Sequence, residues 1–103
     1  MEIDFRSKKL EKILSDDRLM KKHFSSIYSG LKNRMTELQA VRNLSLISHN
    51  PPPRKHKLSG NYEGYWSVDV SKNYRLLFTV SDKDIINENQ INKIIIEEIT
   101  DTH

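Results

Sequence analysis

The sequence predicts an α+β domain in which two N-terminal helices pack on one face of an antiparallel sheet, in the order β-α-α-β-β-β with room for a further strand. Apolar residues recur at helical spacing in the first part of the chain, then alternate with polar residues from residue 65 to 80. A short apolar run, Ile94 to Ile96, lies near the end. A chain of 103 residues has the size of one domain, so we expect a single domain over residues 1–103.

The first elements are short. Residues 2–6 alternate polar and apolar side chains around Ile3 and Phe5, which predicts a strand. Ser7 then offers a side-chain oxygen as an N-cap, and the apolar residues Leu10, Ile13 and Leu14 follow at helical spacing. We therefore expect a helix of about two turns before residue 15.

A second, longer helix is predicted to begin at Asp16 or Asp17 and to run for about six turns. Its apolar stripe consists of Met20, Phe24, Ile27, Tyr28, Leu31, Met35, Leu38 and Val41. Such a stripe is typical of a helix that packs on the core. The cations expected beside the stripe, on a solvent-facing side, are Lys21, Lys22, Lys32, Arg34 and Arg42.

Strand patterns dominate the second half of the chain. Pro51 to Pro53 predict a stiff extended connection, because proline fixes φ and has no N–H to donate. "YWSVDV" and "YRLLFTV", separated by "SKN", predict an antiparallel hairpin with one buried and one accessible face. Arg75 falls on the accessible face. A polar loop follows, and residues 92–103 form the last predicted strand, with cover on both sides.

Charge and composition bound the function. The net charge is +3, but residues 1–58 carry 13 Lys and Arg against 6 Asp and Glu, whereas residues 59–103 carry 4 against 8. This asymmetry indicates a nucleic-acid or acidic protein partner. Cysteine is absent, and no apolar run approaches the ~18 residues of a membrane span or the apolar core of a signal peptide. We expect a cytoplasmic protein with no membrane association.

Four side chains could carry chemistry on the accessible face of the sheet: His56, Arg75, Asp101 and His103. Two histidines, a carboxylate and a guanidinium can supply a general base, a general acid and a cation for a developing anion. Cleavage of an RNA phosphodiester suits this set, because the 2′-hydroxyl is the nucleophile and the protein needs neither a nucleophile nor a cofactor.

The same residues allow plainer interpretations. A histidine in a basic loop is often solvated and idle, and Arg75 can pair with Asp69 on the neighbouring strand. A zinc site made of the two histidines and Asp101 is conceivable, but no ligand spacing supports it. His23 and His49 are expected to be surface residues.

The stretch "HKLSGNYEGYWSVDVSKNYRLLF", with the terminal "DTH", resembles the RelE/HigB superfamily of bacterial toxins from toxin–antitoxin modules, in particular the HigB or plasmid-maintenance "system killer" branch. The residues that match the pattern of this branch are His56, Leu58, Gly60, Gly64, Tyr65, Trp66, Ser67, Asn73, Arg75, Asp101 and His103.

The resemblance implies a ribosome-dependent mRNA endonuclease that acts on message in the A site. It also implies a cognate antitoxin like HigA, whose helix-turn-helix makes the sole contact with operator DNA. By the resemblance, His56 and His103 handle protons, Arg75 stabilises the phosphate in the transition state, and Asp101 orients a histidine or shares the proton transfer. The cations expected to hold RNA backbone are Arg54, Lys55, Lys57 and Lys72.

The chain departs from the branch pattern at four places. Thr102 stands where the branch has Tyr, Ser59 replaces Lys, Lys57 replaces Pro and Asn61 replaces Asp. These changes bear on rate and codon preference more than on the type of reaction. Two alternatives stay open: a ParE-like toxin that acts on DNA gyrase without cleaving RNA, and a catalytically weak chain that works as half of a repressor complex.

Overall fold

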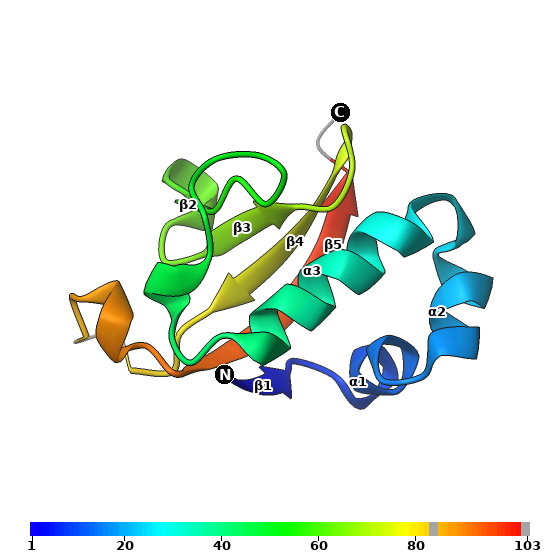
Figure 1. Ribbon diagram of the computed structural model, residues 1–103, viewed down its shortest axis with the longest axis horizontal. Helices are drawn as coiled ribbons and strands as arrows, with labels where there is room; N and C mark the ends of the chain where they lie inside the picture. Colours follow the sequence, from blue (N-terminus) through cyan, green and yellow to red (C-terminus); the bar gives the residue numbers. More distant parts are fainter. Residues whose placement is uncertain (83–84, 102–103) are drawn as a thin grey trace.

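A five-stranded sheet forms the centre of the computed structural model, which describes residues 1–82 and 85–101 (Figure 1). The strand order is β1-β5-β4-β3-β2. The strands are β1 (Glu2–Phe5), β2 (His56–Lys57), β3 (Trp66–Asp69), β4 (Tyr74–Thr79) and β5 (Lys93–Asp101). The predicted α+β class and the β3–β4 hairpin are confirmed, with Trp66 opposite Phe78. The face of the hairpin expected to be accessible is buried at Ser67 and Leu77.

One strand differs from the predicted antiparallel sheet, because β1 pairs with β5 in parallel. Glu2 lies opposite Lys93 and Phe5 lies opposite Ile96. After β1 the chain forms the three helices and then strands β2, β3 and β4 (Figure 1). The last strand, β5, lies between β4 and β1 and runs in the same direction as β1. The apolar run of β5 thereby gains a strand on each side, with β1 as one neighbour and β4 as the other.

Three helices precede the sheet's last four strands: α1 (Lys8–Leu14), α2 (Asp17–His23) and α3 (Tyr28–Ala40). The expected caps form, because the Ser7 hydroxyl accepts from the Leu10 amide at 3.1 Å and the Asp16 carboxylate accepts from the Arg18 amide at 2.9 Å.

The predicted long second helix is wrong as a single element, because it breaks at Phe24. Phe24 has φ −132° and ψ 44°, and a 3₁₀ turn over Ser25–Ile27 leads into α3. An unbroken helix over residues 17–41 would be about 37 Å long, equal to the longest dimension of the whole molecule, 37 Å. The break lets α2 and α3 run in different directions, so that apolar residues of both reach one core (Figure 1).

α3 crosses the sheet and buries its apolar stripe against one face (Figure 1). Leu31 is fully buried on the helix side, as are Val68 and Leu76 on the sheet side. Arg34 was expected to face solvent, but it is also buried, and its Nη1 donates to both carboxylate oxygens of Glu37 at 3.0 Å. The pairing with Glu37 one turn later offsets part of the cost of burying the guanidinium.

Gly30 sets how closely α3 approaches the end of β3. A Cβ at this position would lie 1.9 Å from the Val70 carbonyl oxygen. Alanine favours helix by about 1 kcal/mol over glycine, yet we expect Gly30→Ala to lower the free energy of unfolding by about 1 to 3 kcal/mol, because the backbone must separate. Urea unfolding measures this, with exposed Ser29→Ala as the control. A stabilised Gly30→Ala protein would contradict the close contact.

The connection to β2 differs from the predicted extended segment. Pro51 to Pro53 lie in a turn, which is closed by the Arg54 amide donating to the Asn50 carbonyl at 3.2 Å. The Lys55 amide then donates to the Ser48 carbonyl at 2.9 Å. The prolines therefore reverse the chain, and these backbone bonds fix the residues directly before His56.

Lys55 was expected to hold RNA backbone, but its side chain is only 1% exposed. Its ammonium donates to the Leu44 carbonyl at 2.8 Å and pairs with the Glu88 carboxylate. The ion pair fastens the 3₁₀ turn Glu88–Gln90, which lies in the loop before β5, to the segment that leads into β2. The Lys55 ammonium is therefore buried and paired within the protein, and it is not available to bind an RNA phosphate.

Lys55→Met keeps the apolar stem and removes the ammonium. Breaking a fully buried pair costs about 3 to 5 kcal/mol, and we expect about 2 kcal/mol here because water reaches Glu88, whose side chain is 29% exposed. Urea unfolding tests the loss, with exposed Lys72→Met as a control expected to change stability by less than about 0.5 kcal/mol. Equal stability of the two variants would show that the buried pair contributes nothing.

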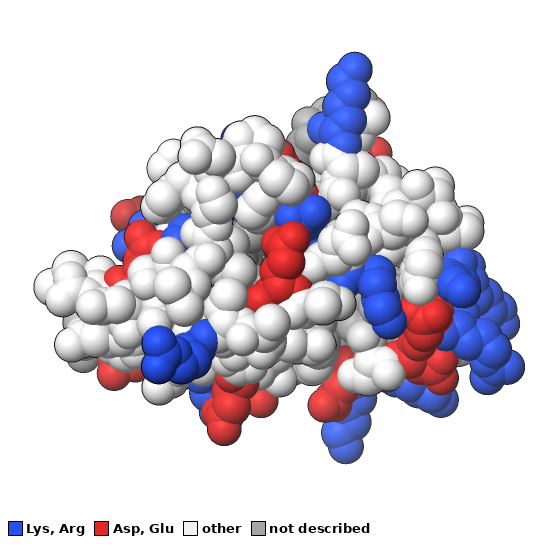
Figure 2. Space-filling model, in the orientation of Figure 1, with Lys and Arg blue, Asp and Glu red and all other residues white. Residues whose placement is uncertain are grey.

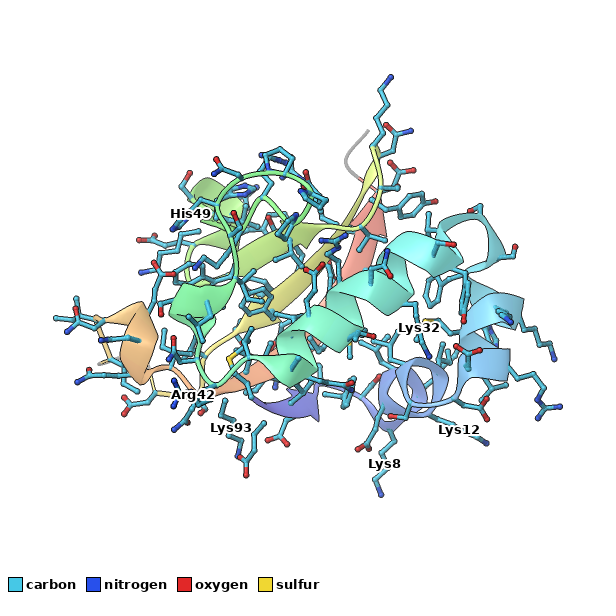
Figure 3. The ribbon with its side chains drawn as sticks, in the orientation of Figure 1. Lys8, Lys12, Lys32, Arg42, His49 and Lys93 are labelled. Carbon is cyan, nitrogen blue, oxygen red and sulfur yellow. The ribbon has the colours of Figure 1, made fainter. Side chains whose placement is uncertain are left out.

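Positive charge gathers over α1 and α2, at the right of Figure 2, with acidic side chains between the cations. Lys8, Lys12 and Lys32 lie there (Figure 3), and Lys32 and Lys21 both pair with Asp17. The basic character of the N-terminal half is therefore mainly a property of this end of the molecule.

Across residues 1–82 and 85–101, no helix has both the length and the apolar character that a membrane crossing requires.

Candidate active site

The sheet face opposite α3 carries the candidate residues. His56 lies across from Ser67, and Ser67 lies across from Leu77, so these three positions form one row over β2, β3 and β4. Asp69 and Arg75 are directly opposite each other one row further along. His56 and Arg75 therefore share a face, two strands and two residues apart, which places their Cα atoms about 12 Å from each other.

A pocket of about 360 Å³ opens beside Arg75. Arg75 and Leu77 of β4 line it together with the end of β5. The other side is formed by the segment after β2, which contributes Leu58, Ser59 and Tyr62. The pocket thus combines a guanidinium, hydroxyl groups, an aromatic ring and apolar side chains. This mixture suits a ligand that has both an anionic and a flat apolar part.

Asp101 and Thr100 supply the β5 side of this pocket. The register places Thr100 opposite Arg75, whereas Asp101 lies opposite Tyr74. Because side chains alternate along a strand, Thr100 shares the face of Arg75 and Asp101 does not. The expectation that Asp101 lies on the accessible face is therefore corrected: it lines the pocket from an exposed position at the end of β5.

Arg75 remains partly accessible, with 30% of its side chain exposed. Its Nε lies 3.9 Å from the Asp69 carboxylate, a long contact for an ion pair. Arg54 binds the same carboxylate with two hydrogen bonds, at 2.6 and 2.9 Å, and this raises the pKa of Arg54. Arg54 is therefore committed to Asp69, while the donors of Arg75 can serve a ligand.

His56 is half-buried on β2. Its Nδ1 lies 3.2 Å from the Arg54 carbonyl oxygen and 3.3 Å from the Ser67 hydroxyl. Because a carbonyl can only accept, the contact with Arg54 favours the tautomer in which Nδ1 carries the proton. Nε2 then has the lone pair that a proton acceptor requires, and the Ser67 hydroxyl also lies near it, at 3.5 Å.

The remaining predicted site residues lie apart from this face. Lys57 is exposed and its ammonium lies 5.4 Å from the Trp66 ring centroid. Lys72 is exposed in the turn between β3 and β4. Of the four expected RNA-binding cations, Lys57 and Lys72 are therefore exposed and Lys55 is buried. Arg54 keeps 39% of its side chain exposed but binds Asp69 with two hydrogen bonds. His103 and Thr102 lie outside the described residues.

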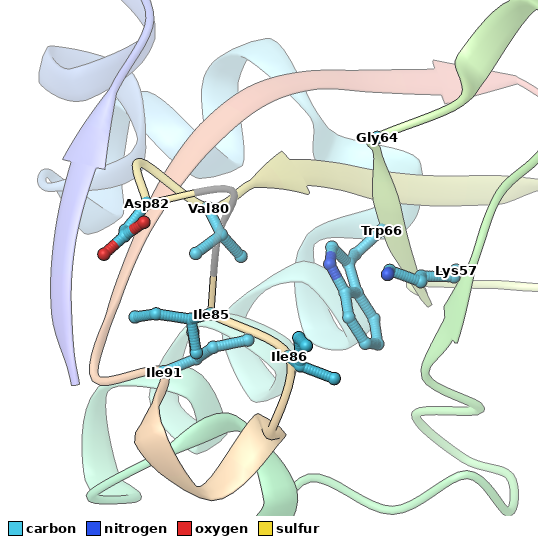
Figure 4. Close-up of a pocket in the computed structure, with 8 residues that line it drawn as sticks. All are labelled: Lys57, Gly64, Trp66, Val80, Asp82, Ile85, Ile86 and Ile91. Carbon is cyan, nitrogen blue, oxygen red and sulfur yellow. The ribbon is translucent and has the colours of Figure 1, made fainter.

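A second, smaller pocket of about 130 Å³ lies at the Trp66 end of the sheet (Figure 4). The Lys57 side chain points toward the Trp66 ring on one side, and apolar side chains that include Ile85, Ile86 and Ile91 form the other (Figure 4). It contains one carboxylate, Asp82, and no histidine among its lining residues. The pocket beside Arg75 also lacks a histidine among its described lining residues, but it combines a guanidinium with a carboxylate and opens on the sheet face that holds His56, so it is the better candidate for catalysis.

The residues described in the structure hold no cluster of three or more metal-ligating side chains. The zinc site considered from the sequence needs His103, which lies outside the described residues. The polar side chains at and near the pocket that can act in proton transfer or phosphate binding are therefore those of His56, Arg75, Thr100 and Asp101.

An ion pair at the neighbouring edge of the sheet gives a pH-dependent stability. Arg6 donates to both oxygens of the Glu97 carboxylate, at 2.9 and 2.6 Å, and Thr79 donates at 2.7 Å. The hydrogen bonds from Arg6, more than those from Thr79, hold the pKa of Glu97 below its ordinary value of 4.5. Glu97 therefore stabilises the folded state above about pH 4.5, and this stability is lost as the pH falls through the lower folded pKa.

We expect Glu97→Gln to lower the melting temperature at pH 7 and to reduce the further fall between about pH 5 and pH 3. Thermal unfolding across this range measures both effects. The exposed neighbour Glu98→Gln serves as the control. Melting curves for Glu97→Gln that run parallel to wild type at every pH would contradict the assignment.

The family model described as the RelE-like toxin of the type II toxin–antitoxin system HigB matches residues 3–92. The chain belongs to this HigB-like toxin family. A relative among characterised proteins, Toxin HigB-1 of Vibrio cholerae serotype O1, is 33% identical over 87 residues, which cover 84% of this chain and 92% of the relative. The chain is thus a RelE-like toxin of a type II toxin–antitoxin system, and the resemblance found in the sequence is confirmed.

Solved structures of other toxins share the fold of this HigB-like toxin. YafQ from E. coli strain BL21(DE3) superposes with a TM-score of 0.58 at 19% identity, over 97% of this chain and 91% of YafQ. The YoeB/ParE toxin from Agrobacterium tumefaciens gives a TM-score of 0.59 at 10% identity, over the full length of both chains. Further similar structures are complexes, DinJ–YafQ from E. coli and YoeB–YefM from Staphylococcus aureus.

Three features of the site were not predicted. Thr100 shares the face of Arg75 because of the β4–β5 register, and Tyr62 reaches the pocket from the segment after β2. The bidentate pair of Arg54 with Asp69 was also missed, although a basic residue before β2 and an acidic residue on β3 were both visible. The signal that could have found this pair is the pairing of β2 with β3, because it brings Arg54 close to Asp69.

Proposed function

We propose that this HigB-like toxin is a ribosome-dependent mRNA endonuclease that cleaves RNA by attack of the 2′-hydroxyl on the adjacent phosphate. The observation that carries the proposal is the pocket in which Arg75, with accessible donors, lies beside Thr100 and Asp101, on the sheet face that also holds His56. Membership of the HigB-like family supports it.

The reaction needs two proton transfers. A general base removes the proton of the 2′-hydroxyl, O2′ bonds to phosphorus, and the P–O5′ bond breaks while a general acid protonates O5′. The products are a 2′,3′-cyclic phosphate and a free 5′-hydroxyl. His56 and His103 are the proposed proton carriers, and Asp101 orients a histidine or shares the transfer. For His56 the carrying atom is Nε2, because Nδ1 faces the Arg54 carbonyl.

Arg75 stabilises the extra negative charge that the phosphate gains as O2′ attacks. A planar guanidinium can meet two phosphate oxygens at once. The sheet backbone holds Arg75 in place, since it lies between Asp69 on β3 and Thr100 on β5. This fixed position allows the donors to face the phosphate without reorganisation. No cofactor is required by this mechanism.

Lys57 and Lys72 are proposed to hold RNA backbone, because both are exposed. The toxin acts on message in the ribosomal A site, and therefore in the cytoplasm. A cognate antitoxin, HigA-like and with a DNA-binding helix-turn-helix, neutralises it and brings it to operator DNA. An acidic segment of this partner would complement the cations over α1 and α2 (Figure 2).

Primer extension on a reporter message tests the proposal after brief induction of the chain. We expect new 5′ ends inside translated codons and none in untranslated regions. Growth arrest without such ends, together with loss of supercoiling by purified gyrase, would replace the proposal with the ParE-like alternative, which shares the fold. Unimpaired growth without new ends would favour the weak repressor component.

A further inference from the structure

Tyr62 stands out in the Arg75 pocket because it is an exposed aromatic residue on a tightly folded backbone. It is 44% exposed. The turn Gly60–Tyr62 that carries it is fixed at both ends, since the Tyr62 amide donates to the Ser59 carbonyl at 3.3 Å and the Tyr65 amide donates to the Tyr62 carbonyl at 2.9 Å. An exposed ring on such a segment loses little further freedom when it binds a ligand.

The backbone around Tyr62 uses two glycines to make this shape. Gly60 has φ +64° and Gly64 has φ +92°, both in the region that favours glycine. The Tyr62 ring also contacts the Tyr65 ring in an edge arrangement, with centroids 5.6 Å apart and planes at 74°. This contact holds the direction of the Tyr62 ring, which lines the pocket opposite Arg75 and Asp101.

We propose that Tyr62 is a base-stacking residue that binds the nucleobase next to the phosphate held by Arg75. The inference deepens the proposed RNA cleavage by naming the substrate part that this end of the pocket recognises. A nucleotide has a flat apolar base and an anionic phosphate, and the pocket offers an aromatic ring with Leu58 on one side and a guanidinium on the other. Its volume of about 360 Å³ is that of a small-ligand site rather than of a large groove.

Stacking predicts a bias in the substrate. Base–aromatic stacking tolerates every base, and the modest preferences that it gives follow the strength of stacking. Purines present the larger ring surface, so Tyr62 favours a purine at the stacked position. The hydroxyls of Ser59 and Thr100 line the same pocket and are suited to the ribose.

A fluorescent trinucleotide tests the site without cleavage. The probe carries 2-aminopurine at its centre and 2′-O-methyl groups throughout, so it cannot be cut, and stacking quenches its fluorescence. We expect Tyr62→Ala to weaken binding by about 5- to 150-fold, the range for one stacked base, and Tyr62→Phe to stay within about twofold of wild type. Leu46→Ala, which removes another exposed apolar side chain, is the control.

Sequencing of the 5′ ends gives a second readout. Wild type is expected to cut beside purines, and Tyr62→Ala to lose that bias while Tyr62→Phe keeps it. Equal quenching by wild type and Tyr62→Ala, or no quenching by wild type, would overturn the stacking role. Tyr62-dependent quenching by a chain that cuts no message would support the base site and refute the proposed nuclease function.

Discussion

Arg75→Ala is expected to slow RNA cleavage by about 100- to 1000-fold, a loss of about 2.7 to 4 kcal/mol of transition-state stabilisation, the scale of one preorganised electrostatic donor. The reason is that Arg54 binds Asp69 with two hydrogen bonds, whereas Arg75 lies 3.9 Å from the same carboxylate and lines the pocket. Cleavage of message on programmed ribosomes measures the rate constant at saturating ribosome.

Two comparisons make the Arg75 result specific. Arg42→Ala removes an exposed arginine elsewhere and is expected to retain full activity (Figure 3). Arg75→Lys keeps the charge but loses the bidentate geometry, so we expect an intermediate rate. Within residues 1–82 and 85–101, the ion pair of Arg75 is its long contact with Asp69, so the melting temperature of Arg75→Ala should stay close to wild type. An Arg75→Ala protein that cleaves at the wild-type rate would remove Arg75 from the mechanism.

His56→Gln is expected to reduce the cleavage rate on the same scale, about 100-fold or more, because glutamine keeps hydrogen bonding but cannot carry a proton. Gln has a side chain of similar reach, so the contacts with the Arg54 carbonyl and the Ser67 hydroxyl can be retained. The decisive assay is single-turnover cleavage on ribosomes.

His23→Gln provides the matched control, since His23 is exposed at the end of α2. We expect His23→Gln to cleave like wild type and His56→Gln to fold normally, with unchanged circular dichroism. Full activity of His56→Gln would leave His103 and Asp101 as the proposed proton carriers and would exclude His56.

The elements with clear periodicity could be predicted from the sequence. The β3–β4 hairpin follows from strict alternation, and the caps at Ser7 and Asp16 follow from residue type, because both signals are local. The break at Phe24 could not be predicted, since the apolar spacing continues through it. The length of this helix is limited by the size of the folded molecule, and a local spacing pattern carries no information about that size.

The sequence predicted which residues are candidates for the site, but not which of their side chains are buried or paired with other residues. Lys55, His56 and Lys57 are adjacent in sequence, yet one is buried against Glu88, one is half-buried and one is exposed. His56 and Lys57 face opposite sides because they are successive residues of β2, whereas the burial of Lys55 depends on contacts with Leu44 and Glu88, which lie far away in the sequence. The position of Asp101 likewise depends on the β4–β5 register, which shifts at an irregularity between Leu77 and Phe78.

The recruitment of Tyr62 to the pocket illustrates the same limit. In the sequence it is one aromatic among Gly and polar residues, which indicates a turn and little else. A backbone hydrogen bond of 2.9 Å from the Leu58 amide to the Tyr65 carbonyl closes the loop that carries Tyr62, and Tyr62 lines the same pocket as Arg75. The proximity of Tyr62 and Arg75 therefore depends on tertiary structure and cannot be predicted from local sequence patterns.

The most direct test of RNA cleavage through the 2′-hydroxyl uses a message with a single 2′-deoxynucleotide on the 5′ side of a mapped cut. Wild-type protein and programmed ribosomes are mixed, and the products are resolved at nucleotide resolution. We expect cleavage at that position to disappear, with other cuts unchanged and ending in 2′,3′-cyclic phosphates. Continued cleavage at the deoxy position would contradict the mechanism built on Arg75 and His56.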